Sequence, residues 1–281
     1  MSQIPTITLH DGVEIPQLGF GTFQIPADET TDNVLTAFEA GYRHVDTAQM
    51  YGNEAEVGAA VRLSGLRRDE VFVTSKLNNG YHARQDALDA FDRSIERMGI
   101  EHLDLFLIHW PLPTIDVDYV ETWKAMEEML ASGRVRSIGV SNFQPAHLER
   151  LFAETDTKPT VNQVEVHPYF DNTEVRAFDA EHGIATEAWS PIGQGDVLDD
   201  PVLNEIGDAV GKSAAQVALR WHIQRGDIVF PKSSNADRIR ENIDIFDFEL
   251  DDEAMTRIDG LDRDARRGPN PDEFDMIPDD A

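Results

Sequence analysis

GYRHVDTAQMYGNEAEVG, residues 41–58, reads as the end of a strand, a loop and the start of a helix. Gly41 ends the helical pattern before it, and Asn53 stands three residues before a glutamate, the spacing of a capping box at a helix N-terminus. Asp46 and Tyr51 lie on the loop between them. In a chain of repeated strand–helix units, such loops lie at the carboxyl ends of the strands, where this architecture places its chemistry. The stretch therefore predicts that a carboxylate and a phenol share one site.

The strand–helix pattern repeats along the rest of the chain. Eight strand-like runs fall near residues 17–20, 43–46, 71–76, 103–109, 135–141, 160–166, 184–189 and 228–231. Helical patterns follow near 29–40, 53–63, 84–98, 117–132, 145–153, 173–182, 213–225 and 235–242, with an extra helix near 201–210. Eight β/α units predict a closed (β/α)8 TIM barrel, an α/β fold that takes roughly 250 residues.

The alternative to a barrel is an open, doubly wound sheet. Its dinucleotide fingerprint needs three glycines directly before a helix. Gly19 and Gly21 supply two, and no helical pattern opens directly on them. The sequence therefore favours the barrel.

The two ends of the chain lie outside the repeat. Residues 5–15 alternate around Asp11-Gly12, which predicts an N-terminal β-hairpin. Residues 262–281 are rich in turn-forming and charged residues and are expected to form a C-terminal loop or tail. We expect residues 1–281 to form a single barrel domain.

Composition excludes several classes of protein. The 281 residues contain no cysteine, which excludes disulfides, thiolate metal sites and thiol nucleophiles. A formal net charge of −29 makes nucleic acid and anionic membranes poor partners. No apolar run approaches a membrane span of about 20 residues, and no signal-peptide pattern opens the chain, so we expect a soluble cytoplasmic protein. Acidic residues spread over the chain, with few lysines, suggest a halophilic source.

Polar residues end nearly every predicted strand. Interior barrel layers favour branched apolar side chains, so polar groups collected at one end indicate a site. These positions are Gly19 to Thr22, Asp46, Lys76, His109, Ser141, Asn142, Gln163, Glu165, Trp189, Ser190, Lys232 and Ser233.

Lys76 is expected to point inward at the barrel rim. An ammonium group is costly there unless it is paired, and Asp46 is the natural partner. A cation beside Tyr51 would lower its pKa from the ordinary value of about 10 and let the phenol donate a proton near neutral pH. The alternative for Lys76 is a buried structural salt bridge.

His109 ends the fourth strand, before Trp110. It could be a core residue, a metal ligand or a hydrogen-bonding group. A metal site would need further ligands such as Asp46, Glu165 and His167, and Lys76 among them would oppose a cation. We therefore interpret His109 as a group that orients a substrate carbonyl.

A basic cluster follows the eighth strand. Lys232 ends that strand, Ser233 to Asn235 can cap the next helix, and Arg238 lies one turn inside it. Backbone N–H groups at a helix start, an ammonium and a guanidinium together predict an anion site, and phosphate is the usual ligand at this barrel position. Trp189 offers a flat apolar face for a planar ring.

Together these motifs resemble the aldo-keto reductase superfamily, whose fold is an eight-stranded β/α barrel with a hairpin over its base. The resemblance covers nearly the whole chain. Its motifs are GYRHVDTAQMYGNE (41–54), LDLFLIHWP (103–111), GVSNF (139–143), NQVEVHP (162–168) and PKS with RIREN (231–242). The short carboxyl tail is similar to prokaryotic members of the 2,5-diketo-D-gluconate reductase type.

The resemblance implies a role for each matched residue. The catalytic tetrad would be Asp46, Tyr51, Lys76 and His109, with Tyr51 as the proton donor. The nicotinamide would be held by Ser141, Asn142, Gln163 and the ring of Trp189. The 2′-phosphate of NADPH would be held by Lys232, Ser233 and Arg238, with Asn242 near the adenine. The rest of the cofactor path would be lined by Thr22, Asp46, Ser190, Ile192 and Gln194. The substrate would contact Tyr51, His109 and Trp110.

The implied activity is NADPH-dependent reduction of an aldehyde or ketone of modest size, carried out by a monomer. Phe23, Met50, Tyr81 and the loops at 112–118 and 193–200 would wall the substrate pocket. One alternative is a cofactor-binding regulatory protein with vestigial chemistry. Another is a metal-dependent barrel hydrolase that uses His109, His167 and Glu165.

Overall fold

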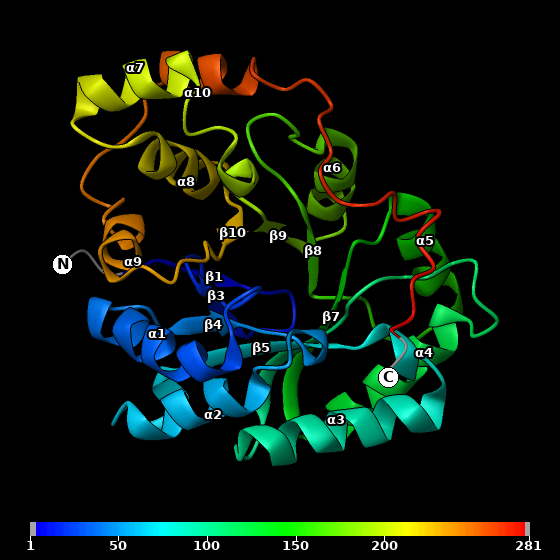
Figure 1. The fold of residues 1–281 in the computed structure, drawn as a ribbon. Coiled ribbons are helices and arrows are strands. Elements are labelled where there is room, and N and C mark those ends of the chain that lie inside the picture. The colour runs from blue at the N-terminus through cyan, green and yellow to red at the C-terminus, as the bar shows by residue number, and fades with distance from the viewer. Residues whose placement is uncertain (1–3, 279–281) are drawn as a thin grey trace.

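Eight parallel strands, paired in the order of the sequence, form the centre of the molecule (Figure 1). The computed structural model describes residues 4–278. The strands are β3 (Phe20–Gly21), β4 (His44–Asp46), β5 (Phe72–Leu77), β6 (Leu103–Ile108), β7 (Val135–Ser141), β8 (Val161–Glu165), β9 (Ala185–Trp189) and β10 (Ile228–Val229). The middle strands β5 and β6 are buried along their whole length, as strands covered on both faces must be. The predicted order of β/α units is confirmed.

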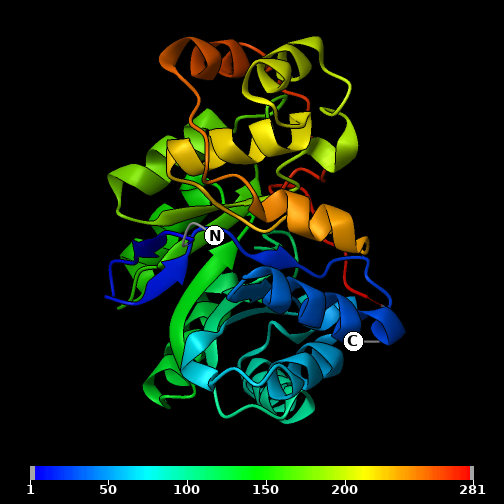
Figure 2. The same ribbon diagram turned by 90° about the vertical axis from the view of Figure 1, so that its left-hand side faces the viewer.

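Helices follow the strands and lie outside the sheet. They are α1 (Ala27–Ala40), α2 (Glu54–Leu63), α3 (Arg84–Met98), α4 (Tyr119–Ala131), α5 (Pro145–Glu154), α6 (Thr173–Glu181), α7 (Pro201–Val210), α8 (Ala214–Arg225), α9 (Ala236–Ile243) and α10 (Asp252–Asp259). Short 3-10 turns are η1 (Gln49–Tyr51), η2 (Arg68–Glu70), η3 (Asn79–Tyr81) and η4 (Gly193–Gly195). Figure 2 shows α1 beside α9, so the first and last units pack together. Helix α10 lies beyond the last predicted helix, and its one buried side chain is Ile258.

The sheet is open at one seam, between β10 and β3, where the sequence predicts continuous closure. A single bridge, between Leu18 and Val229, spans it, with Gly19 N donating to Val229 O at 2.7 Å. Backbone bonds on either side of it run from Val229 N to Gln17 O at 2.9 Å and from Gly21 N to Pro231 O at 3.4 Å. The ladder is interrupted between them because Pro231 has no N–H to donate. Gly21 permits the close approach, since a Cβ at this position would lie 2.5 Å from Phe230 O. Eight parallel strands are therefore confirmed, and regular closure of the barrel is not.

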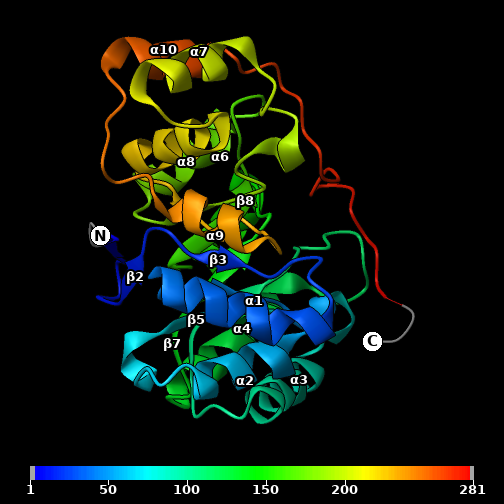
Figure 3. The ribbon, with the colours of Figure 1, turned by 60° about the vertical axis from the view of Figure 1, so that its left-hand side comes forward.

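The N-terminal hairpin covers the amino-terminal end of the sheet. Strands β1 (Thr6–Thr8) and β2 (Glu14–Pro16) pair antiparallel, and Gly12 turns the chain with a φ of 88°. Leu9 and Ile15 are buried in one cluster with residues of the central strands: Phe72, Leu105, Leu107, Val161 and Ile228. Figure 3 shows the hairpin on one side of the molecule and the C-terminal segment on the other. The base of the sheet is thus closed by an apolar cluster, which leaves the opposite end for a site.

The C-terminal segment crosses that opposite end as irregular chain (Figure 1). The backbone N–H groups of Arg267 and Gly268 donate to the two carboxylate oxygens of Glu165 at 2.6 and 2.8 Å. The ring of Phe274 packs on Trp110, with ring centroids 4.3 Å apart. The predicted loop or tail therefore has defined contacts as far as residue 278, and its positions 279–281 lie outside the described residues. Assignment of the whole chain to one domain stays a prediction.

None of the helices in the described part of the chain combines the length and hydrophobicity that a bilayer-spanning segment requires.

Candidate active site

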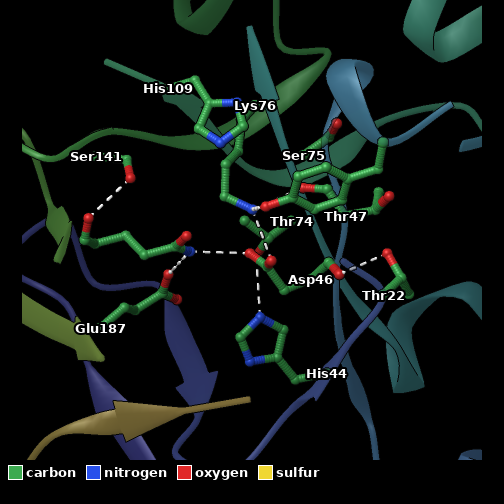
Figure 4. Close-up of polar contacts among 12 residues, drawn as sticks. Thr22, His44, Asp46, Thr47, Thr74, Ser75, Lys76, His109, Ser141 and Glu187 are labelled. Carbon is green, nitrogen blue, oxygen red and sulfur yellow. Dashed lines mark hydrogen bonds and ion pairs between the residues drawn. The ribbon is translucent and has the colours of Figure 1, made fainter. Parts of the chain in front are cut away.

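Asp46 and Lys76 meet at the carboxyl ends of β4 and β5 (Figure 4), and the hydroxyl of Tyr51 lies beside them. The ammonium group of Lys76 donates to Asp46 Oδ1 at 2.6 Å, to the backbone oxygen of Thr47 at 2.9 Å and to Tyr51 Oη at 3.2 Å. Lys76 has no solvent-exposed surface, and these three bonds use all three of its N–H donors. The sequence prediction that Lys76 pairs with Asp46 beside Tyr51 is confirmed.

The turn that carries Tyr51 is fixed from behind. Tyr51 ends η1, and Gly52 reverses the chain with a φ of 69°. The buried side chain of Gln49 donates to Ala90 O at 3.0 Å and to Ser94 Oγ at 2.8 Å. The same side chain accepts from the backbone N–H of Asn78 at 2.8 Å. The phenol is therefore held by helix α3 as well as by Lys76.

Asn53 has a different role from the one that its spacing predicts. It stands at the N-terminus of α2, but its side chain makes no capping hydrogen bond there. Instead its amide donates to Thr22 O at 3.0 Å and to Ile25 O at 3.2 Å, and its oxygen accepts from Thr47 Oγ1 at 2.8 Å. The capping-box prediction is wrong because the side chain of Asn53 is hydrogen-bonded to backbone oxygens of the buried loop after β3 instead. Asn53 joins the loops after β3 and β4.

His109 lies next to Tyr51 at the end of β6. The two rings meet edge to face with centroids 5.7 Å apart. Burial holds the pKa of His109 well below its ordinary value, and the charge of Lys76 lowers it further. Its Nδ1 is buried without a hydrogen bond to any described residue. His109 is therefore a neutral imidazole with free hydrogen-bonding capacity, suited to orienting a polar atom rather than to donating a proton.

The pKa of Tyr51 is raised, which corrects the direction that the sequence predicts. Burial is the largest cause and the charge of Asp46 adds to it, while Lys76 lowers the pKa by less. Burial also lowers the pKa of Lys76, but Asp46 and Tyr51 more than offset it, so that pKa is raised. Tyr51 is consequently a protonated phenol beside a permanent cation. That state suits a proton donor to a strongly basic oxygen.

The residues expected to hold a nicotinamide gather at the ends of β7, β8 and β9. Ser141 Oγ donates to the backbone oxygen of Gln163 at 2.8 Å, and Trp189 Nε1 donates to Asn142 Oδ1 at 2.9 Å. Asn142 also donates to His109 O at 3.0 Å. The amide of Gln163 donates to Asp46 Oδ2 at 2.9 Å. One hydrogen-bonded network therefore links these residues to the Asp46–Lys76–Tyr51 cluster.

The predicted anion cluster lies at a second place, on the rim of the sheet. Asn235 caps α9 by accepting from Asp237 N at 2.9 Å and Arg238 N at 3.0 Å. A hollow of about 480 Å³ lies beside this helix start. Four residues that the sequence predicts for the adenosine end line it together with Ile192: Lys232, Ser233, Arg238 and Asn242. Ser190 and Gln194, also predicted for the cofactor path, do not line this hollow.

Two of the three cationic side chains that line this hollow have no carboxylate partner among residues 4–278. Lys232 and Arg238 are exposed, and neither forms an ion pair within residues 4–278. Lys212, which lines the same hollow, is paired with Asp244 and Asp247. In a chain with 53 acidic residues, two adjacent cations without a carboxylate partner indicate a place for an external anion.

The model of the family described as "Aldo/keto reductase family" matches residues 17–263. The chain belongs to the aldo/keto reductase family. It is therefore an oxidoreductase, as the resemblance of its motifs predicts.

Similar proteins cover almost the whole chain. An aldo-keto reductase of Mycolicibacterium smegmatis is 50% identical over 272 residues, 97% of this chain and 98% of that protein. The glyoxal reductase of Bacillus subtilis is 48% identical over 270 residues, 96% of this chain and 97% of that protein. The crystal structure of a variant of Gox0644 in complex with NADPH has a TM-score of 0.93 and 44% identity, and the match covers 98% of this chain and 99% of that one.

Within this aldo/keto reductase, Glu165 and His167 do not form an open metal site. His167 Nε2 lies 3.0 Å from Glu165 Oε1, and both oxygens of Glu165 also accept from backbone N–H groups of the C-terminal segment. No group of three or more potential metal ligands occurs among residues 4–278. With these donors already engaged, the geometry gives the hydrolase alternative no support.

Three features of the site were not predicted from the sequence. Glu187, two residues before Trp189 on β9, is buried against Gln163, and strand alternation alone could have revealed it. Glu165 holds the C-terminal segment, and Gly268 lies so close to Trp189 that a Cβ would be 2.6 Å from the ring. Residues of the region around α7 complete the anion hollow: Leu198, Asn204 and Asp208. The last two features depend on distant contacts that no local pattern signals.

Proposed function

We propose that the protein is an NADPH-dependent carbonyl reductase in which Tyr51 is the general acid. The observation that carries the proposal is the fully buried ammonium of Lys76, bonded at once to Asp46 and to the hydroxyl of Tyr51. A cation in that position stabilises phenolate only while a proton is leaving the phenol. This is an interaction that grows stronger in the transition state, which is the requirement for catalysis.

We propose a separate role in carbonyl reduction for each residue of the site. Bound NADPH supplies a hydride to the carbonyl carbon, and the chemistry of that step belongs to the cofactor. Tyr51 donates its proton to the carbonyl oxygen as negative charge develops there, and Lys76 stabilises the phenolate left behind. Neutral His109 donates a hydrogen bond that orients the carbonyl oxygen. Asp46 keeps Lys76 charged and in place.

For the cofactor, we propose the residues that the motifs indicate. Ser141, Asn142 and Gln163 would hold the carboxamide, and Trp189 would pack on the nicotinamide ring. Thr22, Asp46, Ser190, Ile192 and Gln194 would line the connecting path. Lys232, Ser233, Arg238 and Asn242 would bind the phosphate and adenine end. The unpaired cations of the anion hollow support this placement, because NADPH carries a 2′-phosphate that NADH lacks.

The substrate is proposed to be a small carbonyl compound. Aromatic rings surround Tyr51 and His109: Phe23 lies 5.0 Å from Tyr51 between centroids, and Trp110 packs against Phe274. Such walls suit a compact aldehyde, ketose or keto acid. The tail resembles the 2,5-diketo-D-gluconate reductase type, and the similar Bacillus subtilis protein is a glyoxal reductase. Glyoxal and 2,5-diketo-D-gluconate are therefore the first probes.

We further propose a soluble, monomeric, cytoplasmic enzyme from a halophile. The charge of −29 supports the last point, because an acidic surface is self-repelling in dilute buffer. The melting temperature should then rise steeply with KCl concentration. A melting temperature that is indifferent to salt contradicts the halophilic origin.

The experiment that tests the function is titration of the protein in high salt with NADPH and then NADH, followed by quenching of tryptophan fluorescence. Tight NADPH binding and weak NADH binding are expected, with oxidation of NADPH once glyoxal is added. Cofactor binding with negligible turnover of every carbonyl tested would favour the regulatory alternative. Binding of neither cofactor would refute the proposal.

A further inference from the structure

Glu187 is a buried carboxyl group that the mechanism above does not use. It lies on β9 inside the sheet, to one side of Asp46 and Lys76 (Figure 4). It has no solvent-exposed surface, and its Oε2 accepts from Gln163 Nε2 at 2.6 Å. Its other oxygen, Oε1, makes no hydrogen bond with a described residue. A buried carboxyl with a single partner calls for an explanation.

The orientation of the Gln163 amide follows from its two neighbours. Gln163 Nε2 donates to Asp46 Oδ2 at 2.9 Å and to Glu187 Oε2 at 2.6 Å. The NH2 group alone has two donors, so both hydrogen atoms are directed to these carboxyl groups. The amide oxygen Oε1 then has no hydrogen-bond partner among residues 4–278. The backbone oxygen of Gln163 is fixed as well, because it accepts from Ser141 Oγ and from Asn142 N.

We propose that Glu187 is a positioning residue for the cofactor: it holds the NH2 group of Gln163 away from the site, so that the amide oxygen accepts from the carboxamide of the nicotinamide. This inference rests on the proposed function, because it assumes that Gln163 contacts NADPH. Without Glu187, the side chain of Gln163 would be hydrogen-bonded to Asp46 alone and would regain rotamer freedom. That freedom would have to be lost again when NADPH binds, which weakens binding.

The role requires an acceptor at Glu187 and not a negative charge. Asp46 is paired with Lys76, whereas Glu187 has no cation partner within residues 4–278. Burial, together with the charge of Asp46, raises the pKa of Glu187 to about 8. A protonated carboxyl still accepts through its carbonyl oxygen, and a glutamine amide offers the same oxygen. Glu187→Gln should therefore preserve the function, while Glu187→Met, which has similar size and no oxygen, should lose it.

Asp179 provides a matched control: it lies on helix α6 and faces the same strand pair, with Asn162 and Thr186 as its donors. It is also fully buried, and it accepts from Asn162 Nδ2 at 3.2 Å, one residue before Gln163. Burial raises its pKa to about 8 as well. Asn162 donates its other hydrogen bond to Phe143 O, away from the site. Asp179→Leu thus removes an equally buried acceptor that makes no hydrogen bond to Gln163.

The test compares NADPH dissociation constants, turnover numbers and melting temperatures of these variants. Glu187→Met should bind NADPH on the order of tenfold more weakly, the scale of one hydrogen bond to a charged or strongly polar group, while Glu187→Gln stays within about twofold of wild type. Turnover at saturating NADPH should change less than the dissociation constant. Asp179→Leu should lower the melting temperature and leave NADPH affinity unchanged.

A double-mutant cycle with Gln163→Leu decides between positioning and general structural support. If Glu187 acts through Gln163, Glu187→Met should not weaken NADPH binding further once Gln163 is removed. Wild-type affinity in Glu187→Met, equal weakening in Asp179→Leu, or additive losses in the cycle would each overturn the proposal. If Glu187→Met does not fold, loss of NADPH affinity in Glu187→Gln would overturn it instead. Failure of the wild type to bind NADPH would refute the proposed function itself, before any variant is compared.

Discussion

Two regions of the molecule present cations in opposite ways. Inside the sheet, Lys76 is fully buried and all its N–H donors are bonded to the protein. On the rim, Lys232 and Arg238 are exposed and form no ion pair in the part of the chain that the structure describes. Burying an ammonium is costly unless it is compensated, so the inner cation is surrounded by its own partners. The outer cations are left free for an anion that the chain does not provide.

We propose that each region has its own task. A compensated, immobile cation changes the chemistry of the group beside it, here the phenol of Tyr51. Uncompensated cations at a helix start recruit a phosphate and contribute to affinity. We therefore expect substitutions inside the sheet to reduce the rate of the chemical step, and substitutions on the rim to reduce cofactor affinity.

Tyr51→Phe should have the largest effect on rate. The variant keeps the ring and removes the proton donor, so the turnover number should fall by about 10²–10⁴-fold, the range for general acid catalysis. Affinity for NADPH should be unchanged, measured by quenching of tryptophan fluorescence. If turnover number and NADPH affinity fall to the same extent, the role of Tyr51 is to stabilise the fold or to bind the cofactor instead.

Lys76→Met should have the largest effect on stability. It leaves Asp46 buried without its cation, which costs about 3–5 kcal/mol when one partner of a buried pair is removed. Adding Asp46→Asn should restore part of the loss, because the uncompensated charge disappears. Urea unfolding of the single and double variants measures both values. A double variant no more stable than Lys76→Met would argue against an ionised pair.

Arg238→Ala should weaken NADPH binding on the order of tenfold and leave NADH binding unchanged, since only NADPH carries the extra phosphate. The loss should shrink as salt is raised, because the interaction is exposed. Arg240→Ala is the matched control: Arg240 lies on the same helix, pairs with Asp237 and does not line the hollow. Equal losses for both cofactors in Arg238→Ala would place the phosphate elsewhere.

Asp179 is a buried acid that forms no ion pair within residues 4–278, in contrast to Asp46, and the stability of the protein should depend on pH because of it. Burial raises the pKa of Asp179 to about 8, so the folded protein retains a proton that the unfolded chain releases above its ordinary pKa of about 4. The unfolded state therefore binds fewer protons between these two pH values. This group's contribution to the free energy of unfolding falls as pH rises through that window, by up to about 1.4 kcal/mol per pH unit.

Asp179→Asn should remove that contribution. The variant should gain stability relative to the wild type steadily from pH 5 to about pH 8, measured by urea unfolding at constant salt. A stability difference that does not depend on pH would mean that Asp179 is ionised in the folded protein.

The sequence predicts the architecture well because its signals are local and repeated. Lys76 and Asp46 follow buried strands, and strand order alone brings them to one end of the sheet. Asn53 is a case that a local pattern cannot predict. Its spacing fits a helix cap, but its amide donates to backbone oxygens of the loop after β3, which is distant in the sequence. The pKa of Tyr51 is a second case, because burial outweighs the lysine that the sequence places beside it.

The open seam and the C-terminal segment could not be predicted for the same reason. Gly21 reads as part of a weak nucleotide motif, whereas its meaning lies in a contact with Phe230, more than two hundred residues away. Residues 262–278 contain no helical or strand period, and their position depends on the carboxylate of Glu165. Contacts that join distant segments through backbone groups leave no pattern in the sequence.

Single-turnover kinetics test the division between the two regions most directly. Wild type, Tyr51→Phe and Arg238→Ala, each with NADPH over a range of concentrations, would be mixed rapidly with glyoxal while NADPH absorbance is followed. We predict that Tyr51→Phe lowers the limiting rate constant and leaves the NADPH dissociation constant unchanged. Arg238→Ala should leave the limiting rate constant unchanged and raise the NADPH dissociation constant. A rate constant that falls equally in both variants would contradict this prediction.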